Sequence, residues 1–390
     1  MKIKGMIFAA GIGSRLTPFT LTAPKALVPV AGVPMLQRVI EKFRNAGICD
    51  IVVNVHHFAE QIKTFLAENH NFGVNIQISD ESNLLLDTGG ALVHAYNLLA
   101  DADAVLIHNA DILTDFDLNN MIDEFTRNQS VAMLLTDRRQ SSRRLYFGVG
   151  TRRLVGWEDT KTDRTLPQGF VPAEVPDIEP LAFGGVHIIS HRLLDALTQY
   201  TDREVFSIIP FYADLCRELP ILAYTPRHSF IWHDVGTPDK LQSATAAAAE
   251  SDKQRLLDTR YLRMAQIWSE NSYCRRRRVG AIIVKDKMII SDGFNGTPSG
   301  FENVCEDETD HTKPYVLHAE ANALTKVARS NNSSEGATLY VTSSPCLECS
   351  KLIIQSGIRR VVYDELYRLS DGLDLLRRAG IDCVHLPLTH

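Results

Sequence analysis

Residues 1 to about 240 alternate between short apolar runs and amphipathic stretches. The runs "KGMIFAAG", "DIVVNVHH" and "AVLIHNAD" have the length and apolar character of buried strands. Between them, "MLQRVIEKFRNAG" and "EQIKTFLAENH" space their apolar residues as helices do, and Gly47 ends the first of these helices. Strands that alternate with helices in this way predict an α/β domain with a parallel sheet.

The pattern changes twice further along the chain. Between residues 137 and 185 the sequence is richer in Arg, Pro and Gly, which predicts strands and loops of a separate lobe. From Asp239 to Ser272 it contains neither Gly nor Pro, which predicts a long helix. The alanine run 246–249 inside this stretch is the best candidate for a boundary. We therefore expect one domain over residues 1–245 and a second over residues 252–390.

The composition limits the classes of protein to consider. A chain of 390 residues is long enough for two separate cores, and 45% hydrophobic and 23% charged residues are ordinary for globular proteins. The formal net charge of −6 gives no support to nucleic acid as a partner. No apolar run approaches the roughly 20 residues that span a bilayer. The start "MKIKGMIFAAG" turns at once into a Gly-rich loop, which favours a first strand over a signal peptide.

The cysteines indicate the compartment and one special site. Of the seven, only Cys346 and Cys349 form a C-x-x-C pair. This usage favours reduced thiols in the cytoplasm and a single metal or redox site.

A glycine-rich turn follows the first predicted strand. Gly11 and Gly13 would let backbone N–H groups close on a phosphate, and Arg15 and Lys25 would supply neutralising charge. The turn is not the dinucleotide-binding fingerprint, because the third glycine of G-x-G-x-x-G is absent. Taken alone, it is equally well explained as a plain connection between a strand and a helix.

The complete set of motifs is more specific. The segments "AAGIGSRLTPFT…APKAL", "LLLDTGGAL", "HNADILTDFDL", "FGGVHIIS" and "WHDVGTPDKL" occur in the order found in the sugar-1-phosphate nucleotidylyltransferase family, which the chain resembles from residue 1 to about 245. The resemblance implies a Rossmann-like, mostly parallel sheet. Within the family, the chain is most similar to N-acetylmuramate-1-phosphate uridylyltransferases, although mannose-1-phosphate guanylyltransferases share much of the pattern. Ala110 departs from the glycine that the family usually has.

The resemblance also implies a reaction and its residues. A sugar phosphate would attack the α-phosphorus of a nucleoside triphosphate, so the site must neutralise and align two anions. Carboxylates suit Mg²⁺, and the metal ligands would be Asp111 and Asp234, although Asp111 alone could merely cap a turn. Lys25 would hold the sugar-side phosphate. The triphosphate and nucleoside would be bound by Arg15, Ala10, Gly11, Gly13, Thr88, Gly89, Gly90 and Asn109.

A second set of motifs lies in the last third of the chain. His318-Ala-Glu320 is followed by Pro345-Cys346-Leu-Glu-Cys349. One histidine and two cysteines can occupy three corners of a zinc tetrahedron and leave the fourth for water. This H-x-E…P-C-x-x-C arrangement is typical of zinc nucleobase deaminases, in which the glutamate, here Glu320, carries protons and does not bind the metal. Each motif is expected to open a helix, whose dipole favours thiolate.

These motifs and "VGAIIVKDKMIISDGFNGTPSG" resemble the deoxycytidylate (dCMP) deaminase family over about residues 258–386. The resemblance implies an α/β/α domain, a dCMP substrate and a homo-oligomer formed through this domain. It also implies that Asn295 and the turn 296–298 grip the sugar and 5′-phosphate, and that Asn322 lies beside the base. Phe294 replaces the family's common Tyr. The four arginines 275–278 are either a solvated charge run or contain a phosphate ligand.

Three alternatives stay open. Transfer-RNA adenosine deaminases carry the same zinc motifs but tend toward a basic surface, whereas "NVCEDETD" is acidic. Cys274, Cys305 and His311 could form a second, structural zinc site. One half of the chain could also be a silent regulatory module, although the complete motif set in each half argues against it.

Overall fold

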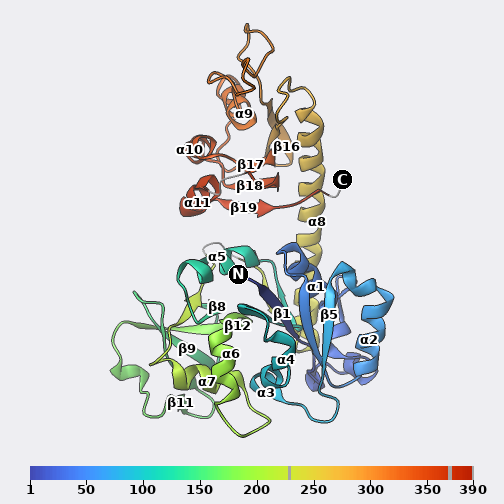
Figure 1. Ribbon diagram of the computed structural model, residues 1–390, viewed down its shortest axis with the longest axis vertical. Coiled ribbons are helices and arrows are strands. Elements are labelled where there is room, and N and C mark those ends of the chain that lie inside the picture. The colour runs from blue at the N-terminus through green and yellow to red at the C-terminus, as the bar shows by residue number, and fades with distance from the viewer. Residues whose placement is uncertain (227–229, 368–370, 389–390) are drawn as a thin grey trace. The chain divides into compact units, whose positions relative to one another are not determined.

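In the computed structural model, residues 1–226, 230–367 and 371–388 are described, and the chain divides into two compact units, Met1–Ala249 and Glu250–His390 (Figure 1). The helices of the first unit are α1 Met35–Asn45, α2 Ala59–Glu68, α3 Asp87–His94, α4 Tyr96–Leu99, α5 Leu118–Arg127, α6 His191–Thr198 and α7 Ile208–Leu215. Its strands are β1 Ile3–Phe8, β2 Pro29–Val30, β3 Val33–Pro34, β4 Asp50–Val55, β5 Asn75–Asp80, β6 Ala104–Asn109, β7 Ile112–Thr114, β8 Ala132–Asp137, β9 Arg143–Gly148, β10 Leu154–Asp159, β11 Arg164–Leu166, β12 Ile178–Ser190, β13 Ile221–Tyr224 and β14 Trp232–Asp234.

The first unit is built on a ten-stranded sheet with the order β11-β10-β9-β12-β6-β1-β4-β5, and off this path β8 pairs with β12 and β13 pairs with β8. The strands β6, β1, β4 and β5 are parallel, as the alternating pattern predicts. The strands β9, β10, β11 and β12 pair in antiparallel fashion and form the lobe expected between residues 137 and 185.

Alternation of side chains along β1 gives the sheet two apolar faces. Ile7 points to a core that includes side chains of α1, α2 and α5. Met6 points to the opposite core, which includes side chains of α3, α6 and α7. Helices therefore cover both faces, and the carboxyl ends of β1 and β6 lead into the loops that carry the predicted phosphate-binding residues.

The second unit has a smaller sheet of five strands with the order β16-β15-β17-β18-β19. The strands β17, β18 and β19 are parallel, and β15 pairs in antiparallel fashion with both β16 and β17. The helix α8 Pro238–Ser269 contributes residues to both units. The remaining elements are β15 Gly280–Lys285, β16 Met288–Phe294, α9 Ala319–Ala328, β17 Thr338–Ser343, α10 Leu347–Gln355, β18 Arg360–Glu365, α11 Asp371–Arg378 and β19 Asp382–His385.

The two faces of this sheet are covered unequally. Ile283 of β15 packs in a core with side chains of α9, α10 and α11. Its neighbour Ile282 packs on the other face with Leu262 and Ala265 of α8. Helices on both faces of one sheet give the α/β/α arrangement that the resemblance implies.

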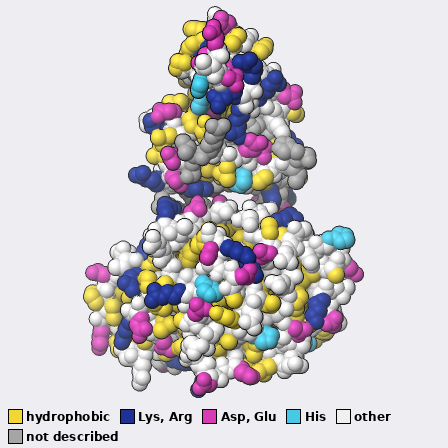
Figure 2. All heavy atoms as spheres, viewed as in Figure 1, with side chains coloured by type: hydrophobic (Ala, Val, Ile, Leu, Met, Phe, Trp, Pro, Cys, Tyr) yellow, Lys and Arg dark blue, Asp and Glu magenta, His cyan; other side chains and the backbone are white. Residues whose placement is uncertain are grey.

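Figure 2 shows Lys and Arg side chains interspersed with Asp and Glu on the face of the first unit that it displays. In the described part of the chain, no helix is long and apolar enough to cross a membrane.

Candidate active sites

The first unit has a cavity of about 490 Å³ at the carboxyl ends of β1 and β6. Eight of the residues predicted from the sequence line it: Ala10, Gly11, Gly13, Arg15, Lys25, Thr88, Asn109 and Asp111. These residues come from four separate segments of the chain, so the parallel sheet brings the motifs together. Polar and basic groups around one cavity can bind an anionic ligand.

The loop after β1 requires glycine at position 13. Gly13 has a φ of 71°, in the left-handed region that glycine adopts readily. A Cβ atom there would also lie 2.8 Å from Cγ2 of Thr20 and 3.0 Å from Cβ of Lys25. The glycine therefore allows the loop to approach Lys25 and to bring Arg15 and Lys25 to the same cavity.

The two predicted magnesium ligands are brought close by a pair of short strands. β7, which directly follows Asp111, pairs with β14, and Asp234 is opposite Ile112. The N–H of Val235 also donates to the carbonyl of Asp111 at 2.8 Å. Asp111 forms an ion pair with Lys25, and Asp234 forms one with Lys240. The carboxylates are thus neutralised by lysines in this structure.

Asp234 itself does not line the cavity, but its neighbour Gly236 does. A Cβ atom on Gly236 would lie 2.6 Å from Oδ1 of Asp234 and 3.6 Å from Nη2 of Arg15. These distances put both Asp234 and Arg15 close to Gly236. Asp234 therefore belongs to the rim of the site.

Gly89 and Gly90 have a different environment from the one expected. Neither lines the cavity. Their N–H groups donate to the carbonyl of Phe206 at 2.9 and 3.2 Å, and a Cβ atom on either would overlap Phe206 or Glu204. The two glycines thus allow α3 to pack against residues 204–206, and their amides are not available to a nucleoside.

Sequence reasoning missed two buried polar residues of this site, Asn54 and Glu81. Oδ1 of Asn54 accepts a hydrogen bond from the N–H of Ala9 at 2.7 Å, and its Nδ2 donates to Oε1 of Glu81 at 2.8 Å. Oε2 of Glu81 accepts from the N–H of Leu86 at 3.3 Å. Burial raises the pKa of the Glu81 carboxyl, against the effect of the bond from Asn54. The only signal in the sequence was a polar residue at the end of the apolar run "DIVVNV".

The second unit contains the predicted His/Cys/Cys group. His318 is the N-cap residue of α9 and Cys346 is the N-cap residue of α10, so two helix starts bring the ligands together. Nδ1 of His318 lies 3.4 Å from Sγ of both Cys346 and Cys349. Tetrahedral zinc with bonds of about 2.3 Å to sulfur and about 2.0 Å to nitrogen would separate these atoms by roughly 3.5 Å. Within the described ranges, this is the only group of three or more such residues that could hold a metal ion.

The hydrogen bonds within this group shift the pKa of each of its three members. The hydrogen bond from Cys349, followed by that from His318, lowers the pKa of Cys346 to about 3. The hydrogen bond with Cys346, followed by burial, raises the pKa of Cys349. The bond with Cys346 likewise raises the pKa of His318.

Glu320 lies beside these ligands and is only 4% exposed. Burial raises the pKa of its carboxyl above the ordinary value. His318, Glu320 and Cys346 all line a second cavity of about 220 Å³. A buried carboxyl with a raised pKa, next to a metal site and open to a cavity, can take up and release a proton.

The two predicted asparagines are engaged with the backbone. Oδ1 of Asn295 accepts from the N–H of Val279 at 2.8 Å, and its Nδ2 donates to the carbonyl of Arg277 at 2.8 Å, although the residue does line the cavity. Nδ2 of Asn322 donates to the carbonyl of Phe294 at 2.9 Å, and Asn322 does not line the cavity. Both amides therefore hold loops in place around the site.

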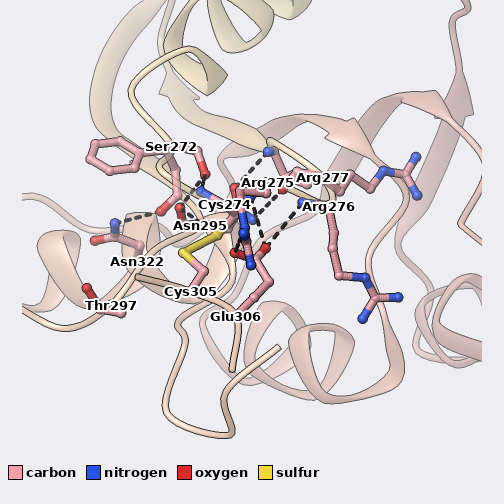
Figure 3. Close-up of a disulfide and its surroundings, with 12 residues drawn as sticks. Ser272, Cys274, Arg275, Arg276, Arg277, Asn295, Thr297, Cys305, Glu306 and Asn322 are labelled. Atoms are coloured by element: carbon pink, nitrogen blue, oxygen red, sulfur yellow. Dashed lines mark hydrogen bonds and ion pairs between the residues drawn. A yellow bond between two sulfur atoms is a disulfide. The ribbon is translucent and has the colours of Figure 1, made fainter. Parts of the chain in front are cut away.

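The cysteines expected at a second zinc site have another arrangement. Cys274 and Cys305 form a disulfide (Figure 3), which differs from the expectation that all thiols are reduced. Nδ1 of His311 lies 2.8 Å from Oγ1 of Thr309. The sequence could not distinguish these possibilities, because a pair of cysteines close in space suits either a metal or a disulfide.

Comparison with known families agrees with both sites. The nucleotidyl transferase family matches residues 4–251, which is more than half of the chain, so the chain belongs to this family. The family described as the cytidine and deoxycytidylate deaminase zinc-binding region matches residues 256–365. Both units thus belong to enzyme families.

Individual relatives cover one unit each. The N-acetylmuramate alpha-1-phosphate uridylyltransferase of Caulobacter vibrioides is 28% identical over 252 residues, which are 63% of this chain and 97% of the relative. The deoxycytidylate deaminase of Enterobacteria phage T4 is 36% identical over 169 residues, which cover 32% of this chain and 88% of the relative. The solved structure of an apo UDP-glucose pyrophosphorylase is 16% identical, with a TM-score of 0.53, and covers 64% of this chain and 99% of that chain. At this identity, it shows a shared fold for the first unit.

Proposed function

We propose that the first unit transfers a uridylyl group from UTP to N-acetylmuramate-1-phosphate and releases pyrophosphate. The observation that carries this proposal is the cavity in which the Gly13 loop, Arg15 and Lys25 meet Asp111. The similarity to the Caulobacter uridylyltransferase over 97% of that relative's length supports the choice of sugar and base.

The chain's own groups account for most of this reaction. The oxygen of the sugar phosphate attacks the α-phosphorus, and the bond from this phosphorus to the bridging oxygen breaks as pyrophosphate leaves. Lys25, with its ammonium group in the cavity, would hold the attacking phosphate, and Arg15 would neutralise the departing one. The two reactants are thereby aligned within one site, which is where most catalysis of phosphoryl transfer originates.

The donor set at Asp111 and Asp234 fits Mg²⁺. Both offer carboxylate oxygens, the ligands that this ion prefers, and the β7–β14 pairing brings them to one edge of the site. When bound, the ion would neutralise charge on the triphosphate. Lys25 and Lys240 neutralise the same carboxylates in the present structure, so they would have to release them to the ion.

The test is an assay of pyrophosphate release with a panel of sugar-1-phosphates and UTP, GTP, CTP or dTTP, with and without Mg²⁺. We expect the highest kcat/KM for UTP with N-acetylmuramate-1-phosphate, and no activity in EDTA. A higher kcat/KM for GTP with mannose-1-phosphate would overturn the substrate pair while leaving the reaction class intact.

For the second unit we propose hydrolytic deamination of dCMP to dUMP. The observation that carries this proposal is the group of His318, Cys346 and Cys349 next to the buried Glu320 in one cavity. Three zinc-fitting ligands leave one position open, as a catalytic site requires.

Glu320 would carry the protons of this reaction. When bound, zinc would lower the pKa of a water molecule toward neutrality. Glu320 would take the proton of the attacking water and pass it to the ring nitrogen N3. The same carboxyl would then take the proton of the hydroxyl now on C4 and deliver it to the amino group, so that the C4–N bond breaks, ammonia leaves and C4 becomes a carbonyl. Its burial and raised pKa suit a group that alternates between the two protonation states.

The test is ammonia release from dCMP, deoxycytidine, cytosine and a tRNA anticodon stem, together with metal analysis of the purified protein. We expect one zinc per catalytic site and a clear preference for dCMP. Zinc-free, active protein, or a preference for the tRNA stem, would overturn this proposal.

A further inference from the structure

Arg139, two residues beyond the end of β8, contacts three strands of the first unit. Its N–H donates to Oδ1 of Asp137 at 2.8 Å, and its guanidinium forms an ion pair with the same carboxylate. The guanidinium also donates to the carbonyl of Phe183 in β12. Its flat face lies over the indole ring of Trp232 in β14, with Cζ 3.5 Å from the ring centroid. One side chain thus joins β8, β12 and β14.

Trp232 is held from a second side by the same segment of β12. Its Nε1 donates to the carbonyl of Gly184 at 2.9 Å, where the pairing of β12 with β8 is interrupted. Gly185, inside this interruption, has a φ of 73°, and a Cβ atom there would lie 3.1 Å from Nδ2 of Asn109, which lines the first cavity. The stack of Arg139 on Trp232 therefore lies beside a bulge that reaches the cavity wall.

The stack acts on the strand that carries a predicted magnesium ligand. Alternate residues of a strand share a face, so Trp232 and Asp234 lie on the same face of β14. Among the described strands, β14 pairs with β7 alone, and each of the two has three residues. Two paired strands of this length are marginally stable by themselves. The position of Asp234 therefore depends on the contacts that Trp232 makes.

The charge of Arg139 acts in the opposite direction. Burial lowers the pKa of Arg139, and the carboxylates of Asp137 and Asp234 oppose this lowering, so Asp234 lies within electrostatic range of the guanidinium. A positive charge within range of a metal ligand repels a cation bound there. Arg139 does not line the cavity, so it is not placed to neutralise a phosphate in it. Positioning explains the placement of this arginine, and charge does not.

We propose that Arg139 is a positioning residue of the transferase, whose stack on Trp232 holds the Asp234 carboxylate where it binds a divalent cation together with Asp111. The proposal rests on the transferase function proposed above and adds a residue to it. Arginine suits this task because its planar group stacks on an indole while its edge donates to a carboxylate and a carbonyl. The compact charge of a lysine cannot do both.

The test compares the full-length wild type with Arg139→Met, Arg139→Lys and Arg138→Ala. Arg138 is the matched control, because it is the neighbouring arginine, its side chain is 79% exposed, and it pairs with Glu179 at 3.0 Å. Mn²⁺ binding to the zinc-loaded chain is measured by calorimetry without substrates, and Asp234→Asn defines the binding that remains without this ligand. Pyrophosphate release is measured against Mg²⁺ concentration, below the temperature at which each variant loses activity on heating.

We expect Arg139→Met to weaken Mn²⁺ binding roughly 3- to 30-fold, because the cation–π contact that holds β14 is lost. The Mg²⁺ concentration for half-maximal pyrophosphate release should rise by a similar factor, while kcat at saturating Mg²⁺ stays close to that of wild type. Arg139→Lys keeps the charge but not the stack, so its Mn²⁺ binding should be weakened nearly as much. Arg138→Ala should behave as wild type.

Three results would overturn the proposal. Tighter or unchanged Mn²⁺ binding in Arg139→Met is the result of removing a repelling charge, and it contradicts positioning. Full Mn²⁺ binding in Arg139→Lys contradicts it as well, and this variant carries the test if Arg139→Met does not fold. Equal Mn²⁺ binding by wild type and Asp234→Asn shows that Asp234 binds no cation, so that there is no ligand to position.

Failure of the transferase function itself has a different signature. If the wild type releases no pyrophosphate with any pair of substrates in the panel, the proposed function is wrong. Mn²⁺ binding requires no turnover, so weaker binding in Arg139→Met and Arg139→Lys than in Arg138→Ala still supports the positioning role.

Discussion

At the scale of single residues, Glu320 gives the most direct test of the deaminase chemistry. Glu320→Gln keeps the shape of the side chain and leaves the three metal ligands unchanged, but it removes the proton carrier. We expect zinc content to be retained and kcat for dCMP to fall by about 10²- to 10⁴-fold. Metal analysis and ammonia release on the same preparation measure both quantities.

Glu348→Gln is the matched control for this change. Glu348 lies between the two cysteine ligands in sequence, but its side chain is 77% exposed and pairs with Lys351 at 2.6 Å. The Glu348→Gln variant should retain full deaminase activity. Loss of zinc in Glu320→Gln would contradict a purely proton-transferring role for Glu320.

Asn54 gives a second test at this scale, in the first unit. It connects Ala9, at the start of the glycine-rich loop, to Glu81, which in turn accepts from Leu86 before α3. Asn54→Ala leaves a buried N–H and a buried carboxylate without this partner, so we expect a loss of about 1–3 kcal/mol in stability. Because both loops line the cavity, we also expect a higher KM for the nucleotide, measured by pyrophosphate release.

Asn75→Ala is a suitable comparison for Asn54→Ala. Asn75 is exposed on the neighbouring strand β5, and its side-chain Nδ2 donates a hydrogen bond to Oδ1 of Asp50 at 2.9 Å. Asn75→Ala should change neither the stability nor the KM for the nucleotide appreciably. A lower melting temperature for Asn54→Ala with an unchanged KM would show that the asparagine supports the fold and does not position the loops.

Residues differ in how far the sequence alone reveals them. The group of His318, Cys346 and Cys349 was predictable because zinc chemistry demands those residue types at a recognisable spacing. Asn54 was not, because its role depends on which loops the sheet brings beside it. For Gly89 and Gly90 the sequence did not reveal that these motif glycines pack closely against Phe206 and Glu204, and their contact with a nucleoside stays a prediction.

At the scale of elements, a buried ion pair joins α8 to the sheet of the second unit. Asp258 of α8 is 2% exposed and accepts hydrogen bonds from Arg360 of β18 at 2.7 and 2.8 Å and from Tyr340 of β17 at 2.7 Å. Burial alone would raise the pKa of Asp258, but the interactions with Arg360 outweigh it and the pKa is lowered. The stabilising contribution is therefore present above the unfolded pKa of about 3.9 and is lost as the pH falls through the lowered value.

Asp258→Ala should destabilise the second unit by about 1–3 kcal/mol, because Arg360 and the hydroxyl of Tyr340 lose this partner while Asp382 still pairs with Arg360 at 3.0 Å. The temperatures at which the full chain loses deaminase activity and bound zinc on heating would measure this destabilisation. The double variant Asp258→Leu/Arg360→Met should be less destabilised than Asp258→Ala. Glu250→Ala, which removes an exposed pair with Lys253, should have little effect. A double variant as unstable as the single one would contradict the ion-pair explanation.

The elements themselves were predictable to different degrees. The parallel strands and their helices followed from apolar periodicity, and the long helix α8 from the absence of Gly and Pro. The pairing of β7 with β14, which brings Asp234 to Asp111, could not be predicted from the local pattern. The two strands have only three residues each and are distant in sequence. Register between distant short strands depends on tertiary packing, which a local pattern does not encode.

At the scale of the whole molecule, two enzyme families share one chain, and the described residues that line each cavity belong to one compact unit. The residues that line the first cavity all precede position 237, and those that line the second all follow position 273. Among the described residues, each cavity is lined by side chains of its own unit. We therefore expect each activity to survive loss of the other. Assembly into a homo-oligomer through the second unit and a cytoplasmic location stay predictions.

The boundary inside α8 makes this expectation testable with two fragments. A fragment of residues 250–390 retains Gln254 and Asp258, which bond to each other at 2.9 Å and, through Asp258, to Arg360. A fragment of residues 260–390 keeps every zinc ligand but loses both. We expect the longer fragment to hold zinc and to deaminate dCMP with nearly the kcat/KM of the full chain. The shorter one should unfold at a lower temperature and lose zinc more readily, because Arg360 and the hydroxyl of Tyr340 lose their bonds to Asp258 and Arg360 keeps only its pair with Asp382.

Thermal melting, zinc content and ammonia release on both fragments decide the matter, with the full chain as reference. If both fragments behave alike, the first part of α8 in the second unit is dispensable and the role assigned to Asp258 is wrong. If the longer fragment folds and binds zinc but is inactive, residues before position 250 contribute to catalysis, and the two units are not independent enzymes.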